Sequence, residues 1–155
     1  MSKIQINASR RDIMQHSAMA ALVAAGLVPS LAHAAPSAAT FQAKTLKDAL
    51  AGLGATAVDA AGKITIGAPD IAENGAVVPV SISTTIPNAN EIYLFVEKNP
   101  FPLAASFTLP AGTEASITTR VKMGQTSNIY AVVKADGKLF STVKETKVTL
   151  GGCGG

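Results

Sequence analysis

The sequence predicts an all-β domain, a sandwich of about seven strands preceded by one short helix. Three observations support this prediction. Segments in which polar and apolar residues alternate dominate the chain from residue 63 onward, and turn-forming residues separate them. Charged residues make up only 15% of the chain, which favours a compact core over a disordered chain. Residues 35–150 are enough for one domain with one core.

A short helix is predicted at the start of this domain. Thr45 and Asp48 have the spacing of a capping box, with Asp in the place usually taken by Glu or Gln. Gly52 and Gly54 would end the helix. One face of the helix would be apolar, because leucines follow at helical spacing: Leu46, Leu50 and Leu53.

Six later segments alternate with the period of two that is typical of strands. In residues 91–97, aliphatic residues occupy one face and the aromatic Tyr93 and Phe95 occupy the other. The last segment is long enough for two strands or for one long bent strand. The six segments are 63–67, 76–84, 91–97, 116–123, 127–134 and 138–150.

Turn chemistry separates these segments. Asp136-Gly137 lies between two alternating runs and is the strongest hairpin signal in the chain. Spacing and turns together predict a sandwich of immunoglobulin-like type, without the Cys…Trp…Cys core of antibody domains, because the chain has no Trp and one Cys. The other connections contain Asn74-Gly75, Pro87-Asn88, Asn99-Pro100, Pro110-Ala111-Gly112 and Gly124.

Residues 98–110 stand out between two predicted strands. They carry three prolines together with Phe101, Leu103 and Phe107. Either these apolar side chains cap one end of the sandwich, or they form an exposed apolar surface for a partner subunit.

Residues 1–34 are typical of an export signal rather than of a folded element. A basic start with Arg10 and Arg11 precedes a mildly apolar stretch, and Ala32-His33-Ala34 is a small-x-small cleavage site. The apolar stretch is too short to span a membrane. The Arg10-Arg11 pair predicts a twin-arginine signal and therefore a periplasmic protein, although Ile13 and Gln15 occupy the usual aromatic and lysine places. An amphipathic helix packed on the domain is the alternative.

The composition of the mature chain excludes several kinds of function. Without residues 1–34 the chain has 10 basic and 9 acidic side chains, so it has no excess of positive charge for nucleic acid. Both histidines, His16 and His33, belong to the predicted signal. The mature chain therefore has no Cys–His or Ser–His pair and no His/Cys cluster for zinc, copper or iron, and its carboxylates are scattered. We expect no metal, no cofactor and no enzymatic activity of its own.

The one cysteine of the chain, Cys153, lies in a glycine-rich terminus that would form a thin, flexible arm. Fully extended, the arm would carry the thiol about 10 Å beyond Leu150. An odd cysteine in an exported protein predicts a reactive thiol or an intermolecular disulfide. About 3% of an ordinary thiol is ionised at pH 7, so a partner's active site would have to activate it. The arm consists of Gly151, Gly152, Cys153, Gly154 and Gly155.

These residues resemble the SoxY family, the carrier subunits of the bacterial thiosulfate-oxidising (Sox) system. The terminal pentapeptide is the specific part of the resemblance, and residues 71–80 and 119–122 support it. The resemblance implies that Cys153 is the covalent attachment point for sulfur. It also implies that the arm glycines let the thiol swing between partners, and that sulfur adducts on Cys153 take the place of a cofactor.

The same resemblance implies a set of partners. A haem-containing cytochrome would couple thiosulfate to Cys153, and a hydrolase would release sulfate. A sulfur dehydrogenase would act next in some organisms. The companion subunit would be SoxZ, a second small β-sandwich protein. A companion without a signal, exported together with this folded chain, would explain the twin-arginine type of signal.

Other functions remain open from the sequence. A structural or adhesive immunoglobulin-like module would dimerise through Cys153, although such a module has no need of a symmetric glycine arm. A carrier with a thiocarboxylate at Gly155 would be cytosolic and ubiquitin-like, which the signal and the short helix disfavour. An enzyme is disfavoured by the missing histidines.

Overall fold

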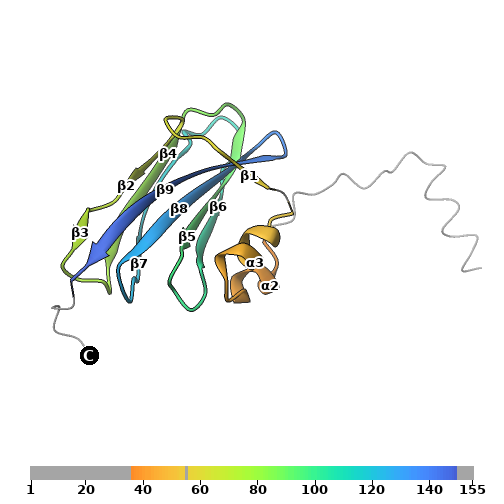
Figure 1. The fold of residues 1–155 in the computed structure, drawn as a ribbon. Coiled ribbons are helices and arrows are strands. Elements are labelled where there is room, and N and C mark those ends of the chain that lie inside the picture. Colours follow the sequence, from red (N-terminus) through yellow and green to blue (C-terminus); the bar gives the residue numbers. More distant parts are fainter. Residues whose placement is uncertain (1–35, 55, 150–155) are drawn as a thin grey trace, which may run out of the picture. The chain divides into compact units, whose positions relative to one another are not determined.

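The computed structural model describes residues 36–54 and 56–149, which form two β-sheets and two short helices (Figure 1). The all-β prediction is confirmed. In chain order the elements are α2 (Ala38–Gln42), α3 (Leu46–Ala51), β1 (Ala57–Asp59), β2 (Ile64–Gly67), β3 (Ile71–Ala72), β4 (Val78–Thr84), β5 (Ala89–Val96), β6 (Leu103–Thr108), β7 (Ser116–Val121), β8 (Ser127–Ala135) and β9 (Lys138–Val148).

The larger sheet has the strand order β1-β9-β8-β5-β6, and β3 pairs with the far end of β9. The smaller sheet has the order β2-β4-β7. Most neighbours are antiparallel, whereas β1 and β3 both run parallel to β9. The segment that contains β3 therefore leaves the smaller sheet after β2, joins the edge of the larger sheet, and returns to the smaller sheet as β4.

Each of the six predicted segments contains a strand, and the last is the single long strand β9. The strand β6 was not predicted, because the sequence indicates either an apolar cap at one end of the sandwich or an exposed surface for a partner in residues 98–110. Leu103 and Phe107 lie on β6, the outermost strand of its sheet, where prolines beside the strand are tolerated. Phe101 is 47% exposed, and the Nζ of Lys44 lies 5.6 Å from its ring centroid.

The predicted helix is confirmed as α3. The Thr45 side chain accepts the Asp48 N–H at 3.1 Å, and Gly52 caps the other end. The preceding helix α2 has only five residues, too few for a periodic pattern, and was not predicted. Its Thr40 is buried against Gly52, where a Cβ atom would lie 2.6 Å from the Thr40 hydroxyl oxygen.

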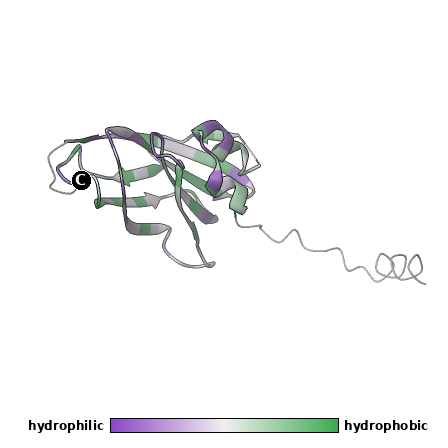
Figure 2. Ribbon diagram, turned by 90° about the horizontal axis from the view of Figure 1, so that it is seen from below, coloured by the Kyte–Doolittle hydropathy of each residue, from purple (hydrophilic) through white to green (hydrophobic). Residues whose placement is uncertain are grey.

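The core consists of two layers on opposite faces of the larger sheet. Aliphatic side chains of β5 and β8 pack between the two sheets, together with Val78, Val80 and Ile82 of β4. On the other face, Tyr93 and Phe95 pack against α3 and its leucines. Figure 2 shows the underlying alternation as green and pale bands along the strands. The predicted two faces of residues 91–97 are thus confirmed, and both are buried.

The hairpin predicted at Asp136-Gly137 is also confirmed. Ala135 pairs with Lys138, and both turn residues have positive φ, 50° and 73°. This is the geometry of a type I′ turn, which matches the twist of the two strands that it joins.

A buried ion pair joins β5 and β8 of the larger sheet. The Glu91 carboxylate accepts a hydrogen bond from the Tyr93 hydroxyl, and its other oxygen lies 3.1 Å from the Lys134 Nζ. Glu91 and Tyr93 are only 4% and 2% exposed. Burial, and next the bond to Glu91, raise the pKa of Tyr93 well above its ordinary value.

Candidate functional site

The predicted site residues lie outside the described residues, so their roles stay predictions. The structure does describe the point at which the chain leaves the domain toward Cys153, at the end of β9. The predicted site residues that the structure does not describe are Cys153, the glycines Gly151, Gly152, Gly154 and Gly155, and the signal residues Arg10 and Arg11.

The end of β9 is held by β3 along one edge (Figure 1). Ile71 pairs with Lys147, and Ala72 pairs with Val148. The Lys147 N–H donates to the Asp70 carbonyl oxygen at 2.9 Å, and the Thr149 N–H donates to the Ala72 carbonyl oxygen at 3.1 Å. Main-chain hydrogen bonds therefore continue to Thr149, the last residue that the structure describes.

Along the other edge, the ladder between β8 and β9 ends where Ser127 pairs with Thr146. Beyond that point a side chain supplies the next acceptor. The Val148 N–H donates to the hydroxyl oxygen of Thr126 at 3.0 Å. The amides of three consecutive residues at the end of β9 are thus all hydrogen-bonded.

The turn after β3 packs closely beneath the same strand end. The Met123 N–H donates to the Gly75 carbonyl oxygen at 2.7 Å. A Cβ atom on Gly75 would lie 2.3 Å from the Met123 carbonyl oxygen and 2.8 Å from Val148 Cγ1. Only glycine allows this approach, which gives a physical reason for the Asn74-Gly75 sequence in residues 71–80.

Charged groups near this strand end are mostly exposed. The Lys144 Nζ donates to the Ala68 carbonyl oxygen at 2.6 Å and lies 3.1 Å from the Asp70 carboxylate. The Asp70 side chain is 89% exposed, so this ion pair is weak.

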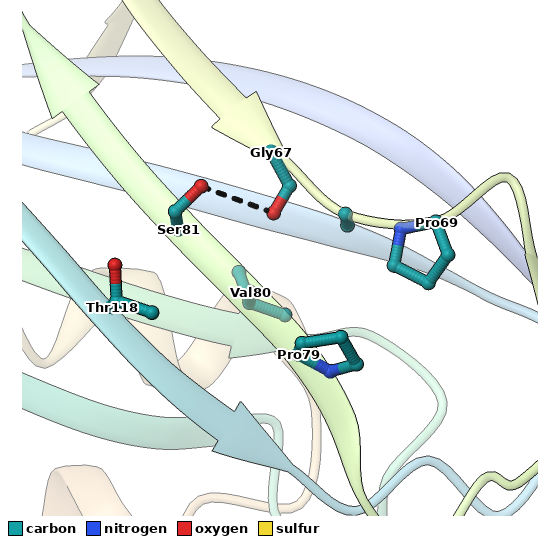
Figure 3. A pocket seen from close by; sticks show the side chains of 7 residues that line it. Gly67, Pro69, Pro79, Val80, Ser81 and Thr118 are labelled. Carbon is teal, nitrogen blue, oxygen red and sulfur yellow. Dashed lines mark hydrogen bonds between the residues drawn. The ribbon is translucent and has the colours of Figure 1, made fainter.

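A shallow groove of about 330 Å³ lies on the outer face of the smaller sheet (Figure 3). Ser81 donates a hydrogen bond to the Gly67 carbonyl oxygen at 3.4 Å within it. Small and apolar residues line the groove without an ionisable group: Gly67, Ala68, Pro69, Pro79, Val80, Ser81 and Thr118. The lining therefore offers no titratable side chain for acid–base chemistry.

Two further absences hold for residues 36–54 and 56–149. No group of three or more His, Cys, Asp or Glu side chains is arranged to hold a metal ion. Within the same residues, no helix is both long and apolar enough to cross a membrane.

Sequence reasoning did not find Thr126, β3 or the Gly75 contact. Residues 71–80 were singled out, but only as a stretch of sequence. A strand of two residues is too short for a periodic pattern, and its partner on β9 is more than 70 residues away. The Asn74-Gly75 turn was the one signal that could have indicated a close backbone approach.

Comparison with known proteins places the chain among sulfur oxidation proteins. The family described as "Sulfur oxidation protein SoxY" matches residues 48–153. A solved structure of the sulfur carrier protein SoxY from Chlorobium limicola f thiosulfatophilum is similar to this chain, with 40% identity and a TM-score of 0.62. The match covers 68% of this chain and 97% of that one. Among curated proteins, none matches the chain.

Proposed function

This chain belongs to the SoxY family, and on that premise we propose that it is a covalent sulfur carrier of the Sox system, with Cys153 as the attachment point. The observation that supports this proposal most strongly is the extent of the family match. It begins in α3, runs through the whole sandwich, and includes Cys153 as its last residue. The match therefore extends beyond the β-sandwich to the thiol itself.

The chemistry follows from a thiol that does not activate itself. When thiosulfate is loaded, the Cys153 sulfur forms a bond to the sulfane sulfur, the thiol loses its proton, and two electrons pass to the haem of the partner cytochrome. In the next step water attacks the terminal sulfone sulfur on the hydrolase. The bond between the two thiosulfate sulfurs breaks, sulfate and two protons leave, and Cys153 keeps a persulfide anion.

This division of labour makes the chain a carrier rather than an enzyme. Both steps take place in the active sites of partners. The chain supplies the Cys153 sulfur, which is oxidised in the first step and keeps the sulfane sulfur in the second. The partners are the cytochrome, the sulfate-releasing hydrolase and, where present, a sulfur dehydrogenase. A SoxZ-like companion subunit binds the sandwich domain.

We further propose that the chain acts in the periplasm and crosses the membrane folded, by the twin-arginine route, with its companion bound. Fractionation of cells that lack the companion gene tests the second part. Normal export of this chain in those cells contradicts co-transport, whereas loss of its export supports it. A periplasmic companion in cells without this chain contradicts it.

Intact-mass spectra test the carrier function. The mature protein is purified from cells grown with and without thiosulfate and measured before and after reduction. We expect reductant-labile additions of sulfur or sulfite-like mass on Cys153, enriched by thiosulfate. A bare thiol, or only a protein–protein disulfide, under both conditions would contradict the proposal and favour the module that dimerises through Cys153.

The glycines beside the thiol give a further prediction. Replacing Gly152 by Val is expected to leave the free energy of unfolding within about 0.5 kcal/mol, because the position lies outside the sandwich. The branched side chain widens and stiffens the arm, so turnover with reconstituted partners should fall several-fold. Steady-state sulfate release measures this effect, with Gly124→Val as the matched substitution outside the arm, since a Cβ atom on Gly124 would meet no atom within 4 Å. Equal rates for wild type and Gly152→Val would show that the arm need not be thin.

A further inference from the structure

The last described residues of β9 are held more firmly than a strand end requires. The N–H groups of Lys147, Val148 and Thr149 all have acceptors within 3.1 Å. Strand ends and chain termini commonly fray, because few contacts hold them. Here the hydrogen bonds alternate between the two edges of the strand, to β3 on one side and to Thr126 on the other.

The strand β3 contributes little to the core. It has two residues, and Ile71 is 58% exposed, whereas only Ala72 is buried. Its carbonyl groups are used instead: Asp70 and Ala72 accept the amides of Lys147 and Thr149. The detour of the chain from one sheet to the other at residues 68–77 therefore serves mainly to hold the end of β9.

Thr126 completes the arrangement from the other edge. The regular ladder between β8 and β9 stops at Ser127. Beyond it, no main-chain group of a described strand accepts the Val148 N–H, and the Thr126 hydroxyl oxygen accepts it instead. Gly75 adds a steric limit, because its close contact with Met123 and Val148 leaves the strand end little room to shift.

We propose that β3, Gly75 and Thr126 form a clamp that fixes where the carboxy-terminal arm begins, so that they are positioning residues for Cys153. The clamp is defined as residues 70–75 and Thr126. This inference rests on the proposed function and deepens it, because a carrier benefits from a constant reach. A partner that binds the sandwich would then find the Cys153 thiol within the same short distance of the end of β9 each time.

The expected size of the effect follows from chain statistics. Four residues lead from Thr149 to Cys153, a span of at most about 14 Å. Release of Lys147, Val148 and Thr149 would lengthen the free segment to seven residues and about 24 Å. The effective concentration of a tethered group falls roughly as the −3/2 power of tether length, which gives a decrease of about twofold.

Thr126→Val tests the clamp, because it removes the acceptor and keeps the shape, and Thr126→Ser is the matched control that keeps the hydroxyl. The complex with the companion is used throughout. In Thr126→Val we expect amide hydrogen exchange at Val148 and Thr149 to be about 10-fold faster than in wild type. In Thr126→Ser we expect exchange at the wild-type rate.

A nitroxide on Cys153, the only cysteine of the chain, measures reach independently of sulfur chemistry. In Thr126→Val the label should broaden amide signals of sandwich residues that it does not reach in wild type. Loading of thiosulfate by the cytochrome should fall by at most about twofold in kcat/KM, because the variant removes one of the three acceptors, while alkylation of Cys153 by iodoacetamide keeps its rate. Thr126→Ser should restore both the reach and the loading.

Two results would overturn the proposal: fast exchange at Val148 in the wild type, or an unchanged nitroxide reach in Thr126→Val despite faster exchange. A wild-type protein that never acquires a sulfur adduct would instead contradict the proposed function. The exchange and nitroxide measurements would still decide whether the clamp exists.

Discussion

Replacing Cys153 by serine is expected to abolish thiosulfate-dependent sulfur loading and to lower sulfate release by reconstituted partners about 100-fold or more. The reason is chemical, because a thiolate is the nucleophile in sulfur transfer and a serine hydroxyl scarcely ionises near neutral pH. Cys153 lies beyond the last strand, so the free energy of unfolding should change by less than about 0.5 kcal/mol. Sulfate release and intact mass measure the loss, and urea unfolding confirms that the fold is intact.

A matched variant separates the presence of a thiol from its position. Gly151→Cys combined with Cys153→Ser keeps one thiol on the arm but moves it two residues toward the sandwich, a shift of at most about 7 Å. We expect iodoacetamide to alkylate this thiol at nearly the wild-type rate, whereas partners turn it over much more slowly. Full turnover of the moved thiol would show that partners do not depend on its reach, and full sulfate release by Cys153→Ser alone would refute the carrier assignment.

Glu91→Ala is expected to cost about 3 kcal/mol of unfolding free energy. The substitution leaves the Lys134 ammonium group and the Tyr93 hydroxyl without their buried acceptor. Removal of one partner of a buried ion pair typically costs about 3–5 kcal/mol, and the lower value applies because the Lys134 side chain is 18% exposed. Urea unfolding measures the loss, which is a large part of the roughly 5–15 kcal/mol that holds a domain together.

Asp70→Ala is the matched control for Glu91→Ala. It breaks the ion pair with Lys144 at a side chain that is 89% exposed, so its cost should stay below about 1 kcal/mol. Equal losses for the two variants would show that burial does not determine the strength of these pairs. Tyr93 adds a pH test, since its raised pKa stabilises the fold at pH values below the ordinary tyrosine pKa and this stability is lost as pH rises above about 10. Tyr93→Phe should remove that loss.

Much of this fold could be predicted because the local signals of caps, turns and alternation indicate the same elements that the buried core requires. The capping box at Thr45, the Asp136-Gly137 turn and the alternation along β4, β5 and β8 all predicted the elements that the structure contains. The missed strands have particular causes. Prolines obscured β6, and β1 and β3 have three and two residues, too few for a periodic pattern.

The candidate site divides in the same way. Cys153 could be singled out from the sequence because its glycine neighbours are unusual for a structural sulfur. Thr126 and β3 could not, because their importance depends on which residues of β9 they meet, and pairing between distant segments is set by the whole sandwich. Isolated Thr and Ala residues carry no local sign of such a role.

The contacts at the end of β9 join segments far apart in the chain, with the Thr149 hydroxyl reaching the Ala72 carbonyl oxygen across 77 residues. Closing a loop of that length costs on the order of 4 kcal/mol of chain entropy, more than a few exposed hydrogen bonds return. These contacts therefore form only while the whole sandwich is folded, and the Thr149 amide should lose its protection from exchange whenever the domain unfolds. The carrier would then offer its sulfur at a defined place only when the entire domain is intact.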